Sequence, residues 1–232
     1  MTLNKYQYTP QRAWGLAFLY LSLLVFFSSI ARVPQQILFQ AQQENLLIDN
    51  NLSYWLFFII CVCVTAYVYG IYWCHNTLIF GRKLHLIWQT VFGATWGIAT
   101  GLWMITLTNI ASNISNGGAI RTYFLSFFAI SLWQALAQSH FWGVYIAPEH
   151  DTVLTNKQKV WRAHVPHLCT SLLFLIIFNS KIMFIALQMF ALILTSIGLR
   201  MPVWWDTTAQ QPPSTRKGLF GLPRTAGART IE

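Results

Sequence analysis

The sequence predicts an all-α, polytopic membrane helix bundle with six transmembrane helices. Hydrophobic residues make up 55% of the 232 residues and charged residues only 9%, whereas about 25% of residues in soluble globular proteins are charged. Six stretches are apolar, free of Asp, Glu, Lys and Arg, and close to the roughly 18 residues or more that a spanning helix needs. The basic residues lie between these stretches, so we expect membrane lipids as partners and no nucleic acid.

The first three predicted spans cover residues 14–31, 54–73 and 84–109. The first is longer than the apolar core of a typical signal peptide, so we expect it to stay in the protein as a spanning helix. The stretch 34–50 mixes Ile and Leu with glutamines and is expected to form a short helix on the membrane surface. The stretch 109–118 is polar and ends in glycine, so we expect a loop there.

The last three predicted spans cover residues 122–147, 163–179 and 182–199. Pro148 should end the fourth span. Asn179, Ser180 and Lys181 form a short turn, so the fifth and sixth spans should form an antiparallel hairpin. Both are just long enough for a hydrocarbon core of about 30 Å, and a shallow re-entrant hairpin is the alternative.

The start of the fifth span carries its own signals. Thr155 or Asn156 can cap a helix that begins near Lys157. We expect that helix to run into the fifth span, with a kink or a restart at Pro166 because proline lacks the backbone N–H.

The basic residues predict the orientation. Three of the fifteen fall on one predicted side: Arg32, Arg121 and Lys181. Twelve fall on the other: Lys5, Arg12, Arg82, Lys83, Lys157, Lys159, Arg162, Arg200, Arg216, Lys217, Arg224 and Arg229. Loops rich in Lys and Arg stay in the cytoplasm, so both termini are expected there. We divide the chain into a transmembrane domain, 1–203, and a basic cytoplasmic tail, 204–232, whose Pro-, Thr- and Gly-rich composition predicts disorder.

A row of small residues in the third span predicts close helix packing. Gly93, Gly97 and Gly101 are spaced four apart and share one face of a helix. Such a face lets a second helix approach closely, because packing must drive helix association in lipid. We favour a helix of the same chain as the partner over a second copy.

All six histidines fall at or near the predicted cytoplasmic side, and four of them lie in the densest polar stretch. His140, His150, His164 and His167 occupy residues 140–167, where Glu149 and Asp151 flank His150. These six residues are our candidate site, at the cytoplasmic ends of the fourth and fifth spans. Histidine both ligates metals and transfers protons near neutral pH. His75 and His85 are interpreted as ordinary interfacial residues.

Two chemistries fit this stretch. The first is a metal centre: His140, His150, His164 and His167 could ligate a transition metal such as iron, or His140 could hold a haem with His164 or His167. The second is metal-free acid–base catalysis by Glu149, Asp151 or a histidine. The spacing matches no diagnostic metal motif. In a purely structural interpretation, the two acids pair with Lys157, Lys159 or Arg162, and His164 and His167 are interfacial anchors.

The leading functional hypothesis is a membrane enzyme acting on a lipid or isoprenoid-type substrate, such as an isomerase, a cyclase or a metal-dependent oxidoreductase. Aromatic residues make up 16% of the chain, and their π faces can stabilise a cationic intermediate. The alternative is a non-enzymatic scaffold or assembly factor that uses its glycine face. A solute carrier is disfavoured, because no Asp or Glu lies within a predicted span.

Overall fold

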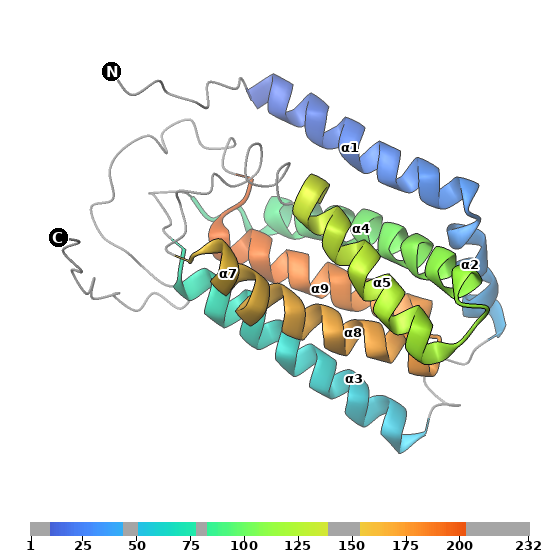
Figure 1. Cartoon of the computed structure of the whole chain (residues 1–232). Helices are drawn as coiled ribbons and strands as arrows, with labels where there is room; N and C mark the ends of the chain where they lie inside the picture. The colour runs from blue at the N-terminus through green and yellow to red at the C-terminus, as the bar shows by residue number, and fades with distance from the viewer. Residues whose placement is uncertain (1–9, 44–50, 78–82, 139–153, 203–232) are drawn as a thin grey trace.

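A computed structural model describes residues 10–43, 51–77, 83–138 and 154–202. In these ranges the regular structure is entirely helical, as predicted. Five helices are long and apolar enough to cross a membrane, and a sixth candidate is a bent pair of helices. The helices run alongside one another as a single bundle (Figure 1). The predicted all-α fold is therefore confirmed in the described ranges, and their five or six candidate spans are consistent with a multi-pass membrane protein.

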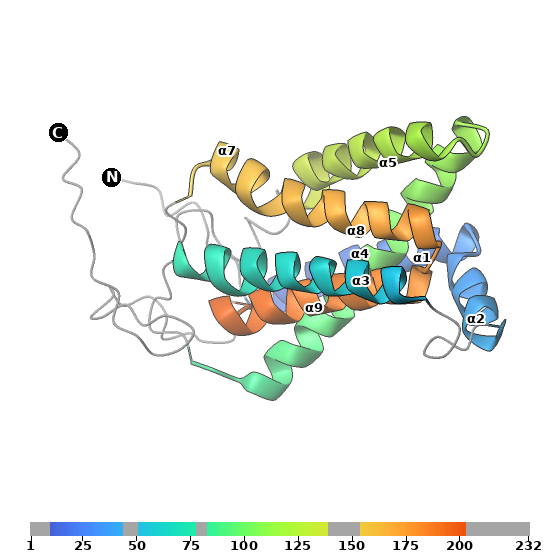
Figure 2. The same cartoon turned by 90° about the horizontal axis from the view of Figure 1, so that it is seen from below.

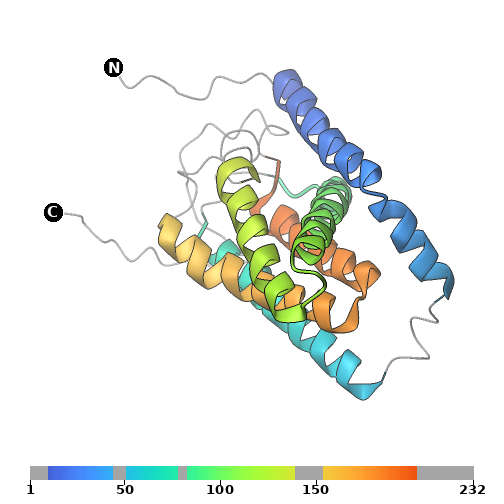
Figure 3. The ribbon, with the colours of Figure 1, turned by 45° about the vertical axis from the view of Figure 1, so that its right-hand side comes forward.

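The bent pair consists of α1 (Pro10–Ile30) and α2 (Val33–Gln43). The two helices meet at an angle of 68°, and Arg32 in the bend has a φ of 58°, in the left-handed region that breaks a helix. Helix α2 overlaps the stretch 34–50, for which the sequence predicts a short helix, and its location at the membrane surface stays a prediction. Figure 3 shows α1 and α2 along the outer edge of the bundle.

The second span is α3 (Leu52–Thr65), which continues as a π-helix, η1 (Ala66–Trp73). Asn51 caps it by accepting a hydrogen bond from the Tyr54 backbone N–H at 3.0 Å. The end at Trp73 is the one predicted.

The third span, α4 (Leu86–Ile114), is longer than predicted. The expected loop from residue 109 is wrong for its first part, because the helix continues for about one and a half more turns. Ala111 in this part is buried, so packing holds the extra turns despite their polar neighbours. The helix stops only where Asn116 and Gly117 adopt positive φ angles.

The fourth span is α5 (Ala119–Trp133), which continues as a second π-helix, η2 (Gln134–Gln138). The rest of the predicted fourth span, with Pro148, lies outside the described residues.

The helix predicted to begin near Lys157 does run into the fifth span, so the span begins before residue 163. It runs without interruption through α7 (Asn156–Lys159), the π-helix η5 (Val160–His164) and α8 (Val165–Phe178). Thr155 and Gln158 form a reciprocal capping box: each backbone N–H donates to the other's side-chain oxygen, at 3.0 and 3.2 Å. The candidate span of 22 residues is about 33 Å long, so it is not marginal in length.

The sixth span, α9 (Lys181–Leu199), returns from α8 as the predicted antiparallel hairpin. Asn179 in the turn has a φ of 50°. Gln40 of α2 makes two hydrogen bonds to this turn. Its Nε2 donates to the Asn179 carbonyl at 2.8 Å, and its Oε1 accepts from the Lys181 N–H at 3.1 Å.

The predicted glycine face lies against α9 of the same chain. A Cβ built on Gly93 would lie 2.6 Å from the Leu192 carbonyl oxygen, and one on Gly97 would lie 2.5 Å from the Met189 Cα. At Gly101 the nearest atom is a side-chain carbon, 3.2 Å away. Figure 2 shows α9 in the interior, with α3 and α8 alongside it. Since α9 covers this face, a scaffold would have to bind its partners through another surface.

We predict that Gly97→Ala destabilises the protein by at least about 1–3 kcal/mol, because the new methyl group meets the backbone of α9. Gly15→Ala is the matched control, since a Cβ there meets nothing within 4 Å. The measurement is the unfolding midpoint of the purified protein in detergent. Equal midpoints for the two variants would contradict the packing described.

Candidate functional site

Two of the predicted site residues, His164 and His167, lie within the described structure. His140, Glu149, His150 and Asp151 lie outside the described residues, so their place in the site remains a prediction. Both described histidines are on the fifth span and point toward the second. With Thr65, Tyr69 and Gln188 they form what we call the histidine cluster: His164, His167, Thr65, Tyr69 and Gln188.

The imidazole of His167 is hydrogen-bonded at both nitrogens. Its side chain is only 3% exposed. The Nδ1 atom lies 2.9 Å from the Thr65 hydroxyl oxygen, and the Nε2 atom lies 3.2 Å from the Gln188 Oε1. One imidazole therefore joins the second, fifth and sixth spans.

Counting donors and acceptors gives two arrangements of this network. If the Thr65 hydroxyl donates to the Cys61 carbonyl at 2.7 Å, Nδ1 of His167 carries the ring proton, and its Nε2 accepts from a Gln188 amide turned by a half-turn. If the hydroxyl donates to Nδ1 instead, Nε2 carries the ring proton and donates to the Gln188 Oε1 without that half-turn.

Gln188 has one polar atom without a partner in the described structure. Its side chain is 4% exposed, and its Nε2 is buried with no hydrogen-bond partner. After the half-turn the oxygen takes that place instead. Either way, one end of the amide remains unsatisfied beside His167, which is costly in an apolar interior.

His164 is held differently. Its Nδ1 lies 3.3 Å from the Tyr69 hydroxyl, and its ring packs edge-on against Trp73 with the centroids 5.3 Å apart. Its Nε2 makes no hydrogen bond within the described part of the chain. An imidazole anchored through one nitrogen, with the other available, is the usual state of a histidine that ligates a metal or transfers a proton.

Two π-helical segments carry the residues around His164. The π-helix η1 bears Tyr69 and Trp73, and η5 ends at His164. In η5 the Val165 N–H bonds to the Val160 carbonyl five residues back, immediately before Pro166, which has no N–H to donate. Such wide turns are often found at functional sites. They change which residues share the inner face.

The charges described near His164 are positive. Lys157, Lys159 and Arg162 lie on the same helical segment as His164. All six acidic residues of the chain lie outside the described residues. The predicted pairing of Glu149 and Asp151 with these cations is therefore untested.

The described residues alone do not form a metal centre. Within the described ranges, no three His, Cys, Asp or Glu side chains gather. His164 and His167 are three residues apart on one helix face, so they cannot approach one haem iron from opposite sides. His167 would also have to give up a hydrogen bond to ligate a metal. The metal set His140, His150, His164 and His167, and the haem pairs with His140, remain predictions that need residue 140 or 150.

The partners of His164 and His167 were not predicted from the sequence. His75 and His85, interpreted as interfacial residues, are exposed. Thr65, Tyr69 and Gln188 come from the second and sixth spans, whereas the predicted site used the fourth and fifth. Gln188 carried a usable signal, since it is the only amide in the predicted sixth span. Tyr69 carried none, because its segment is aromatic throughout.

Comparison of the chain with protein-family models, with curated proteins and with solved structures found no match in any of the three.

We predict that His167→Leu and Gln188→Leu each destabilise the protein by about 1–3 kcal/mol, because each leaves a buried polar partner unsatisfied. The double variant should be less destabilised than the sum of the two, with a coupling of about 0.5–3 kcal/mol. A double-mutant cycle on unfolding midpoints measures this coupling. His75→Leu, at an exposed histidine, is the control. Strict additivity would show that the two side chains do not interact.

Proposed function

We propose that this chain is an integral membrane enzyme that acts on a lipid or isoprenoid-type substrate, with His164 as its proton-transferring or metal-ligating group. One observation supports this most strongly. The His164 ring is anchored through Nδ1 by Tyr69, flanked by Trp73, and has its Nε2 available. An imidazole set inside an apolar bundle is costly unless it has a partner or a task.

His167 is assigned a positioning role in this proposal. Both of its nitrogens are engaged by Thr65 and Gln188, so it holds the fifth span against the second and sixth. From the sequence, His164 and His167 are both candidate catalytic residues. The hydrogen bonds favour distinct tasks, with His164 reacting and His167 fixing its position.

The remaining members of the proposed site come from residues 139–153. If the enzyme uses metal-free acid–base catalysis, His164 transfers one proton, and Glu149 or Asp151 transfers another to or from the substrate. In the metal form, His140 and His150 join His164 as ligands of iron or another transition metal, or His140 shares a haem. Tyr69 and Trp73 present aromatic faces beside His164, and such faces stabilise a developing cation in an isoprenoid substrate.

The scaffold is the competing proposal. Its predicted surface, the glycine face, is covered by α9. A scaffold would therefore use an outer helix, and substitutions in the histidine cluster would affect only the stability of the protein.

The proposed orientation puts the histidine cluster and both termini on the cytoplasmic side, with the basic tail 204–232 near anionic lipid headgroups. The positive-inside distribution of Lys and Arg supports it. The first residues of α1 and the last residues of α9 also lie toward the same end of the bundle (Figure 1).

Labelling tests the orientation. In a cysteine-free background, we predict that a membrane-impermeant thiol reagent modifies Gln35→Cys in intact cells. Lys157→Cys should react only after the cells are permeabilised. Both positions are exposed. The reverse pattern would put the histidine cluster on the outer side and overturn the proposed localisation.

Lipid profiling tests the function. In cells from which the gene has been deleted, we predict that the wild-type chain changes the abundance of at least one lipid or isoprenoid species. The His164→Ala variant should be present at the normal protein level, but the cells should have the same lipid profile as the deletion strain. The reason is that losing an acid–base group slows a reaction by about 10²–10⁴-fold. His75→Ala, at an exposed histidine, should behave as wild type.

Two measurements on the purified protein distinguish the metal, haem and metal-free versions of the proposal. Metal analysis and a visible spectrum, each repeated on His164→Ala, separate bound metal, haem and metal-free chemistry. A wild-type lipid profile from His164→Ala, with no change in metal content, would favour the scaffold instead.

A further inference from the structure

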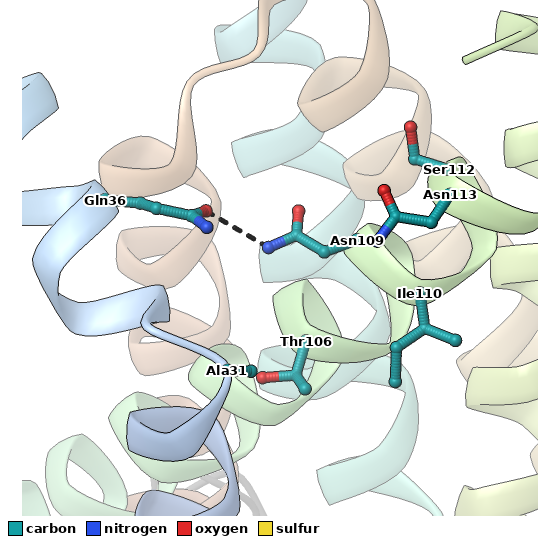
Figure 4. A pocket seen from close by; sticks show the side chains of 7 residues that line it. All are labelled: Ala31, Gln36, Thr106, Asn109, Ile110, Ser112 and Asn113. Atoms are coloured by element: carbon teal, nitrogen blue, oxygen red, sulfur yellow. Dashed lines mark hydrogen bonds between the residues drawn. The ribbon is translucent and has the colours of Figure 1, made fainter. Parts of the chain in front are cut away.

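A second candidate site lies at the opposite end of the bundle from the histidine cluster. A cavity of about 370 Å³ opens between the bend that joins α1 to α2 and the last turns of α4. Figure 4 shows the side chains that surround it: Ala31, Gln36, Thr106, Asn109, Ile110, Ser112 and Asn113. The volume is at the small end of the range for ligand sites, so it suits a headgroup rather than a whole lipid.

The cavity offers uncharged hydrogen-bonding groups of both kinds. Asn109 Nδ2 donates to Gln36 Oε1 at 3.1 Å, which fixes the two amides side by side across the cavity (Figure 4). The Asn109 Oδ1 acceptor and the Gln36 Nε2 donor have no further partner within the described structure. The Ser112 hydroxyl and the Asn113 amide are open as well.

A deeper hydroxyl in the same wall behaves differently. Thr106 Oγ1 is satisfied by the Leu102 carbonyl at 2.9 Å and by the Ser28 hydroxyl at 3.1 Å. The open groups are therefore confined to the part of the cavity that faces outward, where a ligand can reach them.

The lining selects a class of ligand. No charged side chain is among the seven lining residues, and recognition of phosphate or carboxylate relies on Arg, Lys or clustered backbone N–H groups. Adjacent amides that offer both donor and acceptor atoms suit hydroxyl groups, which are themselves both. The fitting ligand is an uncharged group that carries several hydroxyls.

The surroundings indicate that this group belongs to a lipid. Ile110 lines the cavity and is 48% exposed, and Ile30 at the end of α1 is 64% exposed. Exposed apolar side chains thus lie in the cavity lining on α4 and directly before the lining residue Ala31 on α1. We propose that the cavity binds the uncharged, hydroxyl-rich headgroup of a membrane glycolipid, with the acyl chains against the exposed apolar side chains of α1 and α4. This proposal is independent of the function proposed for the histidine cluster.

The test measures ligand binding to the purified full-length chain in detergent. The probes are monogalactosyl diacylglycerol, free galactose, phosphatidylserine and phosphatidylcholine, and the readout is native mass spectrometry together with the thermal midpoint. We expect the glycolipid to be retained and to raise the midpoint more than either phospholipid. If free galactose binds as tightly as the glycolipid, the acyl chains contribute nothing, the ligand is a soluble sugar, and the lipid assignment is overturned. Equal retention of all three lipids, or none, overturns the proposal.

Variants locate the binding. Asn113→Leu removes an amide whose side chain makes no hydrogen bond in the described structure, so the fold should be unaffected. It should weaken glycolipid retention by about tenfold, the equivalent of one hydrogen bond. Asn109→Leu should do at least as much. Gln35→Leu, an exposed α2 position outside the cavity lining, is the matched control. If Asn113→Leu and Asn109→Leu retain glycolipid as well as Gln35→Leu does, the site is not this cavity.

Discussion

The close approach of α4 and α9 is the constraint on which the rest of the bundle depends. In a bilayer, apolar side chains gain nothing by leaving lipid for a protein interior, so helices associate through packing and buried hydrogen bonds. Gly93 and Gly97 let the backbones of α4 and α9 meet at distances that no Cβ would allow. The same contact fixes Gln188, whose carbonyl oxygen lies against Gly97 and whose Cγ lies near Gly101. From Gln188 the hydrogen bonds continue to His167 and Thr65, so a van der Waals contact at the centre determines where a polar network can form.

The π-helical segments explain how polar and aromatic side chains reach this network. In a regular helix, nearly the same face is turned toward the bundle along the whole length. A π-helical turn rotates the residues that follow it about the helix axis. In the fifth span the wide turn ends at His164, just before Pro166. Proline would otherwise leave an unsatisfied carbonyl and a clash with the preceding turn. The π-helical turn that accommodates Pro166 thus ends at His164. Tyr69 and Trp73 contact His164 at that point.

The sequence was most informative where a single local cause decides the structure. Hydropathy predicted the spans, the spacing of Gly93, Gly97 and Gly101 predicted a close contact, and Thr155 predicted a cap. It was less informative where a distant partner decides. Helix α4 extends to Ile114 because Ala111 is buried against other elements, and no local pattern in 109–118 shows that. Similarly, His164 and His167 were identified as polar residues in an apolar span, but Tyr69 and Gln188 are separated from them by at least twenty residues and became visible only once the helices were packed.

The two hydrogen bonds from Gln40 to the α8–α9 turn influence the position of His164. His164 lies fifteen residues from Asn179 along one continuous rod, a lever arm of about 22 Å. A tilt of about one degree at the turn therefore swings the imidazole by about 0.4 Å, a shift comparable to the tolerance of a reactive geometry. Helix α2, at one end of the bundle, thus influences the position of a side chain toward the other end, and a ligand that weakens the two Gln40 hydrogen bonds would shift the imidazole.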